Sequence, residues 1–418
     1  MTSTSSALRP FSVPASRAAL RPVRGQGSEI FGEDGRRYLD AASGLWNVSL
    51  GWTQTILSQS LHDQADQLLY ANMFDWSNEA ADRLCDRLIG YLGPEFTNVY
   101  LSTTGSTAVE TAVRVARMAH RIGGKASKQT IISVERGYHG GGLMSLSASG
   151  STRGEMLWEE PLPGFTIIPG PPDEHASLAE LEHQLKEKGD TVAAFLIEPI
   201  LGSGGVVIPS HEYAGAVSRL CRKHDVLLIN DEVATSGGRC GHMFVGAHLG
   251  YEPDIVASAK GLASGCFPVG ATIFRGSVID RFIKQQVPLV FGSTQDGNPI
   301  GCSAALATFD YIEGNNLMAR AAALGEHLHA KLNELRGGAL HSVRGMGLML
   351  GLELRHTTGE RTLFTDQEAA VVRRECMEQG LLIYHFDGGL SLFPPMTISE
   401  EDCDLVVEII ADVLSTQA

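Results

Sequence analysis

The sequence lacks any apolar run of membrane-spanning length and any signal-type apolar segment, so we expect no membrane partner. It is also poor in basic residues, because 33 lysines and arginines stand against 48 acidic residues, for a formal net charge of −15. That balance disfavours nucleic acid and anionic membranes as partners. The seven cysteines include no Cys-x-x-Cys pair, which predicts reduced thiols in a cytoplasmic protein.

Three catalytic motifs are missing as well. The stretch His139-Gly140-Gly141-Gly142 resembles the oxyanion-hole motif of esterases, but no Gly-x-Ser-x-Gly sequence supplies a nucleophile. No Gly-x-x-x-x-Gly-Lys-Ser/Thr loop occurs, and the glycines at 345–351 are spaced one residue too widely for a dinucleotide motif. A hydrolase, an NTPase or a dehydrogenase is therefore disfavoured.

One lysine stands out among the residues that are present. The apolar stretch at 255–259 stops at Lys260, which Gly261 follows. An amine held at the end of a buried strand is costly to keep charged, and a lowered pKa would favour the nucleophilic form that reacts with carbonyl groups. A lone lysine of this kind is more often a surface residue, so the functional interpretation depends on the motifs that accompany it.

An acidic residue occupies a similar position earlier in the chain. Residues 226–230 form an apolar run that is too short for a helix, and Asp231 follows it. Such runs are typical of parallel strands covered on both faces, and ligands in open α/β sheets lie beyond the carboxyl ends of these strands. We therefore expect Asp231 to point into a site.

Two further segments supply a phosphate site and an aromatic ring. Gly105-Ser106-Thr107 opens an amphipathic stretch, and free N–H groups at a helix start bind phosphate well. Tyr138-His139 follows a β-type run at 130–134. Singly, Tyr138 would more often be a core residue and His139 a satisfied interior histidine. Together with Asp231 and Lys260, in this order, they suit one cofactor, pyridoxal 5'-phosphate (PLP).

The motifs resemble those of the class III (ω-type) aminotransferases, which are fold type I PLP enzymes, over nearly the whole chain. The matching segments are Gly105-Ser106-Thr107, Tyr138-His139-Gly140, Glu198-Pro199-Ile200, Asp231-Glu232-Val233, Lys260-Gly261-Leu262 and Ser293-Thr294. Because they occur in the family's order, chance similarity is a poor explanation. The resemblance implies an α/β fold with a mostly parallel, seven-stranded-type sheet in a large domain, plus a smaller α+β C-terminal domain.

The resemblance also assigns roles to residues. It makes Lys260 the Schiff-base lysine and Asp231 the partner of the pyridine nitrogen, with Val233 on the ring face opposite Tyr138. It implies that Thr294 reaches the cofactor phosphate of another subunit, and hence a homodimer. The implied reaction is a ping-pong transfer of an amino group between a small-molecule donor and a carbonyl acceptor.

The sequence departs from the family in the region that binds substrate. Ser391 stands where the branch that handles 2-oxoglutarate carries an arginine, so Glu198 lacks its usual partner. Trp46 resembles a pocket residue of the pyruvate-using branch, and His385 and Arg153 are further candidates for the pocket. We therefore expect at least one amine, aldehyde or ketone substrate without a carboxylate next to the reacting carbon, in specialised-metabolite or modified-peptide biosynthesis.

Other activities stay open at this point. Racemases, aminomutases and decarboxylases share the same cofactor residues. A catalytically inactive binding protein of this fold is disfavoured because Lys260 and Asp231 are both present.

The pattern of the chain predicts three parts. Residues 1–53 form an N-terminal arm and hairpin segment, with the hairpin at 28–40. Residues 54–299 form the large PLP-binding domain, in which strands alternate with helices. Residues 300–418 contain a long linking helix, to about residue 335, and the small C-terminal domain.

Overall fold

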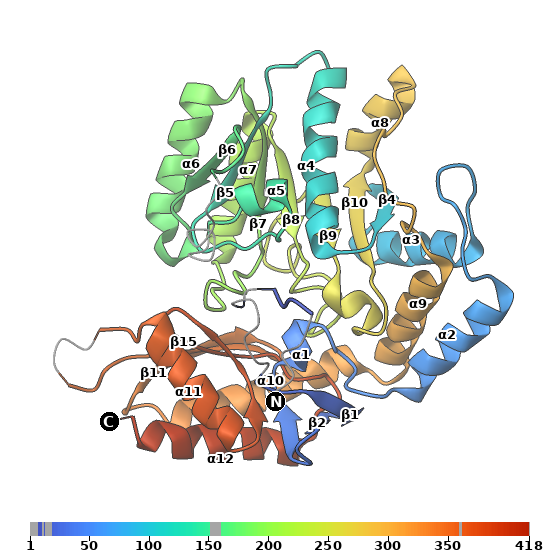
Figure 1. The fold of residues 1–418 in the computed structure, drawn as a ribbon. Helices are drawn as coiled ribbons and strands as arrows, with labels where there is room; N and C mark the ends of the chain where they lie inside the picture. The colour runs from blue at the N-terminus through green and yellow to red at the C-terminus, as the bar shows by residue number, and fades with distance from the viewer. Residues whose placement is uncertain (1–6, 11, 13–18, 151–159, 359–361, 418) are drawn as a thin grey trace.

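The computed structural model describes residues 7–10, 12, 19–150, 160–358 and 362–417. A seven-stranded sheet with its helices forms one body, and two four-stranded sheets with further helices lie below it in Figure 1. The proposed domain limits at residues 53 and 299 remain a prediction. No helix within the described residues is long and apolar enough to cross a membrane.

The large sheet has the strand order β4-β10-β9-β8-β7-β5-β6. Its strands are β4 (Phe96–Ser102), β5 (Thr130–Val134), β6 (Phe165–Ile168), β7 (Val192–Ile197), β8 (Leu227–Asp231), β9 (Ile255–Ser258) and β10 (Gly270–Arg275). Only β10 runs against its neighbours, β4 and β9, while the remaining pairs are parallel. The prediction of a mostly parallel sheet of seven strands is therefore confirmed.

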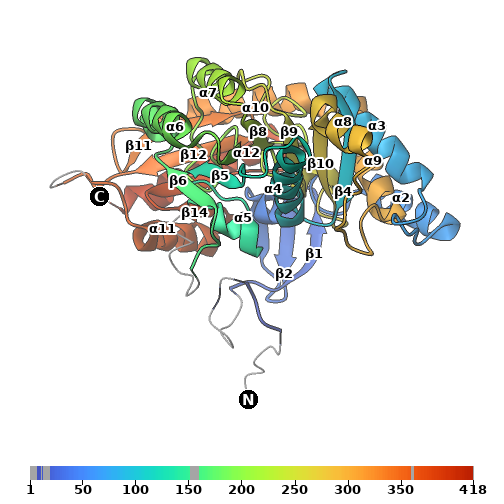
Figure 2. The ribbon, with the colours of Figure 1, turned by 90° about the horizontal axis from the view of Figure 1, so that it is seen from above.

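Helices cover both faces of this sheet, as Figure 2 shows from above. One face packs against α4 (Gly105–Ile122) and α8 (Gly276–Gln285), and the other against α6 (Glu174–Lys188) and α7 (His211–Lys223). All six residues of β7 and all five of β8 are buried. Burial on both faces explains why these strands are continuous apolar runs rather than alternating ones.

The remaining elements of this body flank the sheet or its edge. They are α2 (Thr55–Gln67), α3 (Glu79–Leu92), α5 (Leu143–Ser147), η2 (Pro171–Asp173), η3 (Lys260–Ala263) and α9 (Pro299–Gly314). The start of α4 is fixed by Thr104, whose hydroxyl accepts from the N–H of Thr107, while the Thr107 side chain bonds back to Thr104. This reciprocal cap ends β4 sharply and holds the first turn of α4 at the sheet edge.

One of the two smaller sheets joins strands from both ends of the chain, because β13 pairs with β3. The first has the order β1-β2-β3-β13 and the second β11-β12-β15-β14. Their strands are β1 (Pro22–Gln26), β2 (Glu29–Gly32), β3 (Arg37–Asp40), β11 (Leu340–Met346), β12 (Met349–Leu354), β13 (Leu381–Leu382), β14 (Tyr384–Phe386) and β15 (Gly389–Leu392). Strands β2 and β3 pair antiparallel, which confirms the predicted hairpin. The accompanying helices are α1 (Ser43–Trp46), α10 (Leu317–Glu334), α11 (Asp366–Glu378) and α12 (Glu400–Ser415).

The predicted single linking helix is wrong. The pattern at 299–335 forms two helices, α9 and α10, because the chain turns between them at Asn315 and Asn316. Asn316 has a φ of 50°, in the left-handed region. Asparagine tolerates this region better than most residues, so Asn316 can form the turn that follows Gly314, the last residue of α9.

Candidate active site

The candidate site is a cavity of about 450 Å³ at the carboxyl ends of the parallel strands. Its described lining includes Trp46, Thr104, Gly105, Ser106, Tyr138, His139, Glu198, Asp231, Val233, Lys260, Phe267 and Tyr384. These residues come from the ends of β4, β5, β7, β8 and β9 and from segments near the smaller sheets. The topology therefore brings together side chains that are far apart in sequence, at the sheet edge where α/β folds bind ligands.

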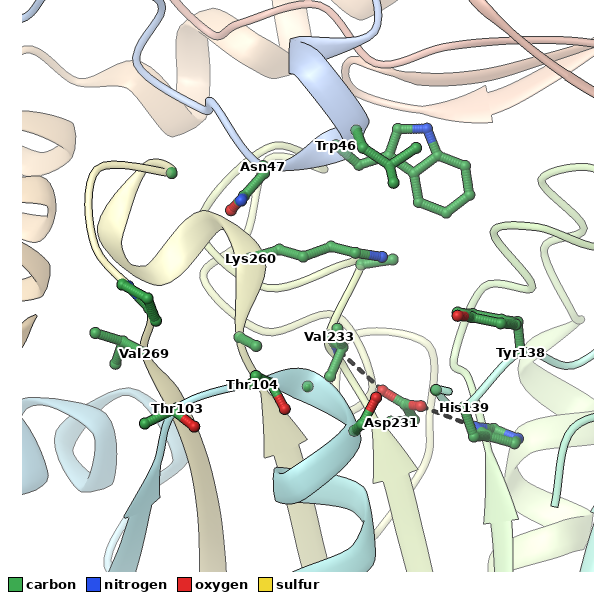
Figure 3. A pocket seen from close by; sticks show the side chains of 18 of the residues that line it. Trp46, Asn47, Thr103, Thr104, Tyr138, His139, Asp231, Val233, Lys260 and Val269 are labelled. Carbon is green, nitrogen blue, oxygen red and sulfur yellow. Dashed lines mark hydrogen bonds and ion pairs between the residues drawn. The ribbon is translucent and has the colours of Figure 1, made fainter. Parts of the chain in front are cut away.

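Asp231 lies at the bottom of this cavity, 3% exposed, as the last residue of β8. Its Oδ2 lies 2.8 Å from Nδ1 of His139, and its Oδ1 accepts from the N–H of Val233 at 3.0 Å. Since an ionised carboxylate only accepts hydrogen bonds, Nδ1 of His139 is the donor in this pair. The two bonds fix the orientation of the carboxylate (Figure 3).

Lys260 stands directly after β9, on the first residue of η3. Its φ of 41° is unusual for a residue with a side chain and places it at a sharp strand-to-helix turn. Its Nζ lies 4.6 Å from the ring centroid of Trp46. The side chain therefore extends across the cavity above Asp231, as Figure 3 shows.

Two residues at the start of α4 line the cavity, Gly105 and Ser106. As the first residues of a helix, their N–H groups have no partner inside the helix and suit an anion. The Ser106 hydroxyl accepts from the N–H of Gly141 at 3.0 Å, which leaves its own proton available. Thr107 does not line the described cavity, because its hydroxyl is used in the helix cap with Thr104.

Glu198 follows β7 and is 4% exposed. Its two oxygens accept from the N–H groups of Tyr138 at 2.9 Å and Gly202 at 3.1 Å. Burial raises the pKa of this carboxyl to about 7, with His139 acting to lower the pKa and Asp231 to raise it.

Trp46 forms the opposite wall of the cavity and is 4% exposed. Its indole stacks on Phe393 with ring centroids 4.2 Å apart and meets Tyr384 edge-on at 5.8 Å. Arg239 holds this arrangement from behind, since its Nη1 donates to the carbonyl of Phe393 at 2.9 Å and to the hydroxyl of Ser43 at 3.2 Å. The guanidinium is buried, which lowers its pKa to about 10.

Besides Thr107, three predicted site residues lie outside the described cavity lining. Thr294 is exposed in the segment before α9. His385 lies beside Tyr384, with ring centroids 5.7 Å apart, and its Nε2 lies 3.5 Å from Oδ1 of Asp366. Arg153 lies outside the described residues, so the structure does not place it.

Some lining residues were not predicted from the sequence. Tyr384 arrives from β14, and Phe267 from the loop between η3 and β10. Tyr384 directly precedes the predicted His385, and the two rings lie 5.7 Å apart, centroid to centroid. This adjacency to a predicted residue is the sequence signal that could have pointed to Tyr384. Arg239 could have been found as a lone arginine within a glycine-rich segment, Gly237-Gly238-Arg239-Cys240-Gly241.

Comparison with known proteins identifies the family. Residues 11–414 match the family described as Aminotransferase class-III. An omega-aminotransferase of Caulobacter vibrioides is 33% identical over 400 residues, which cover 91% of this chain and 90% of that protein. An acetylornithine aminotransferase of Aquifex aeolicus is also 33% identical, over 95% of this chain and 98% of that protein. The PLP-bound structure of an amine transaminase from an uncultivated Pseudomonas species superposes with a TM-score of 0.92 at 30% identity, covering 100% of both chains.

The chain therefore belongs to the class III aminotransferases. It is a fold type I transaminase that uses PLP, which confirms the family, fold class, activity and cofactor expected from the motifs. The relatives named above do not share one substrate name, so they leave the donor and acceptor of this enzyme to be inferred from its own residues.

The cavity fits PLP on observations of its own. A Cβ atom added to Gly105 would lie 2.7 Å from Cγ1 of Val233, so glycine keeps the space beside Val233 open. Val233 and Tyr138 flank the Asp231 carboxylate, which leaves room for a flat ring between them (Figure 3). A buried carboxylate suits a protonated pyridine nitrogen, and the start of α4 suits a phosphate.

Proposed function

We propose that Lys260 is the residue that binds PLP covalently and then carries the proton in the transfer. The observation that supports this most directly is the position of its amine, in the cavity above Asp231 and next to Trp46. When bound, PLP withdraws electrons from the substrate carbon that bears the nitrogen, so that this carbon can lose and regain a proton. In this proposal the Lys260 amine would accept that proton and return it at a neighbouring carbon.

The other lining residues hold and orient the cofactor in this proposal. Asp231, fixed by His139, accepts the pyridine N–H and stabilises its positive charge. Gly105, Ser106 and Thr107 form the phosphate end, with Thr107 acting through the helix cap rather than by direct contact. Tyr138 and Val233 pack on the two ring faces.

We further infer that at least one substrate lacks a carboxylate next to the reacting carbon. Arginine binds carboxylates by a bidentate, charge-assisted pair, yet the described lining of the cavity contains no arginine. Ser391, at the family position for that arginine, is 1% exposed on β15 and too short to replace it. A second candidate is a carboxylate substrate bound by Arg153, whose position is not described.

A panel of amine donors and carbonyl acceptors, with the products identified by mass spectrometry, tests this inference. We expect simple amines and aldehydes or ketones to outperform their α-carboxylate analogues in at least one half-reaction. The inference is wrong if 2-oxoglutarate with a simple ω-amino acid is the best pair by a wide margin. The expected setting is the biosynthesis of a specialised metabolite or a modified peptide.

We propose that the working unit is a homodimer. Thr294 is exposed and remote from the described lining of its own cavity, so it is available to the phosphate site of a second copy. The segment before α3 exposes several large apolar side chains, including Leu69 (62%), Phe74 (63%) and Trp76 (64%). Apolar patches of this kind favour burial against another chain. Light scattering that shows an active monomer would overturn the proposal.

We infer a cytoplasmic location from the cysteines. All seven are free thiols, and most are buried. Proteins that keep many unpaired cysteines are typical of reducing compartments. Fractionation of cells that produce the protein tests this inference.

A further inference from the structure

Glu198 is a buried carboxyl group that lines the cavity, and no cationic side chain among the described residues is hydrogen-bonded to it. Among the described residues, its donors are the backbone N–H groups of Tyr138 and Gly202. The nearest charged neighbours are the His139–Asp231 pair, and the His139 Nδ1 is already bound to Asp231. A carboxylate removed from water and left without a counter-ion is costly, so the site favours a bound cation.

Aromatic rings adjoin this carboxylate. A Cβ atom added to Gly202 would lie 3.1 Å from Cζ3 of Trp46 and 3.4 Å from Oε2 of Glu198, so the indole edge and the carboxylate oxygen border one small space. Tyr138 and Tyr384 line the same cavity. Aromatic rings and a carboxylate are the groups that proteins use to bind ammonium ions.

One amine of the protein already lies against the Trp46 ring. Nζ of Lys260 lies 4.6 Å from the ring centroid of Trp46, within the range of a cation–π contact. The indole is therefore placed to contact an amine inside the cavity, and its edge adjoins the Glu198 carboxyl group at Gly202.

We propose that Glu198 and Trp46 form a subsite for a second, non-reacting ammonium group, so that the preferred amine donors are diamines and the matching acceptors are amino-aldehydes or amino-ketones. This inference rests on the proposed function, because it names the class of substrate that lacks the carboxylate. The raised pKa of Glu198 agrees with it, since an unpaired buried carboxyl takes up a proton that a bound cation would displace.

The test compares diamines with uncharged analogues of equal length in the first half-reaction. Purified holoenzyme is mixed with diamines of three to six carbons, with the corresponding monoamines and with the amino alcohols, and the absorbance change of the bound cofactor gives the rate and the saturation constant. We expect at least one diamine to exceed both analogues by about tenfold in rate over saturation constant. Glu198→Gln should reduce that ratio to nearly one.

Glu135→Gln is the matched control. Glu135 follows β5 and is exposed, so this variant removes a charge of the same sign near the cavity without changing its lining. The ratio of diamine to monoamine should stay as in the wild type. Comparing the same ratio of amines between variants cancels differences in amine basicity. The cofactor absorbance and the melting temperature of Glu198→Gln show whether the variant still folds and binds PLP.

The outcomes separate this inference from the proposed function. If the monoamines react as well as the diamines in the wild type, the ammonium subsite is wrong and the proposed function stands. If Glu198→Gln keeps the preference, another group recognises the second amine and the inference is again wrong. If no amine without a carboxylate changes the cofactor absorbance while amino acids do, the proposed substrate class fails first.

Discussion

His139 and Asp231 form a buried side-chain pair, with Nδ1 of the histidine 2.8 Å from Oδ2 of the aspartate. Nε2 of His139 is buried and has no hydrogen-bond partner among the described residues. Hydrogen bonding therefore fixes the ring only through Nδ1. The pair keeps the carboxylate aimed into the cavity at the position expected for the pyridine nitrogen. His139, which follows Tyr138 in the sequence, is thus a positioning residue for Asp231.

Replacing this histidine should weaken the cofactor more than it weakens the fold. In His139→Phe, Asp231 loses its side-chain donor and keeps only the Val233 N–H, which removes a charge-assisted bond of about 1.5–3 kcal/mol. We expect the dissociation constant of PLP to rise about ten- to hundredfold, measured by absorbance titration of the apoenzyme. His139→Asn, which can still donate, should recover part of the affinity. Unchanged PLP affinity in His139→Phe would contradict the positioning role.

Lys260 should be the only lysine that PLP modifies. Borohydride reduction followed by peptide mapping is expected to find the cofactor on the peptide that contains Lys260, and modification of any other lysine would refute the assignment. Lys260→Ala should lower turnover by more than about 10²-fold, because the variant loses the proton carrier. It should still bind PLP through the residues around Asp231 and Ser106, which a spectral titration can measure. Lys284→Ala, an exposed lysine on α8, is the control.

The central part of this fold could be predicted because a strand that is buried on both faces has a continuous apolar sequence. Strands β7 and β8 are covered on both faces, so they read as short apolar runs, and the carboxyl ends of such strands locate Asp231 and Lys260. The break at Asn316 was missed because the apolar periodicity continues across it, although Gly314-Asn315-Asn316 contains residues that commonly end helices.

Contacts between distant segments explain the residues that were missed. Tyr384 reaches the cavity only because β14 pairs with β15 in the smaller sheet, next to the wall formed by Trp46. Arg239 acts through backbone carbonyls of Phe393 and Pro394, more than 150 residues away along the chain. Neither relationship is encoded in local spacing.

Arg239 should control the position of Trp46. Arg239→Met removes the bonds to the Phe393 and Pro394 carbonyls. The Phe393 carbonyl still accepts from the Ser43 hydroxyl, so the Pro394 carbonyl is the acceptor that loses its described donor, at a cost of about 1–3 kcal/mol. Because Trp46 stacks on Phe393, we expect the Michaelis constant for amines to rise more than kcat falls. Steady-state kinetics and thermal unfolding measure both effects. Arg219→Met, an exposed change on α7, should leave both unchanged.

Sharing of Thr294 between subunits predicts complementation in hybrid dimers. Thr294→Val should weaken the phosphate site of the partner copy, and Lys260→Ala should inactivate its own site. If each site combines Lys260 of one chain with Thr294 of the other, a hybrid dimer of the two variants has one site with both lesions and one with neither. Mixing the variants after mild dissociation should therefore restore some activity. Complete absence of recovery, with hybrid formation shown by native mass spectrometry, would contradict the shared site.

Glu198 should make both substrate preference and stability depend on pH. Burial raises its pKa to about 7, and the charged groups that line the same cavity are Asp231, His139 and Lys260. Below this value the carboxyl is neutral and attracts an ammonium weakly, while above it the carboxylate is present. The diamine preference of the half-reaction should therefore increase as pH rises from about 6 to about 8.

The raised pKa of Glu198 also determines the direction in which stability changes with pH. A folded-state pKa above the ordinary value of 4.5 means that the folded protein binds the proton more tightly than the unfolded chain. The contribution of Glu198 to stability is thus fully present below about pH 4.5 and is lost as pH rises through about 7. Glu198→Gln has no carboxyl group to ionise. Its free energy of unfolding should therefore increase relative to that of the wild type from pH 5 to pH 8. Chemical unfolding of both holoenzymes at the two pH values measures this change. A difference that stays constant, or that moves in the other direction, would show that Glu198 is ionised throughout and already has a cationic partner.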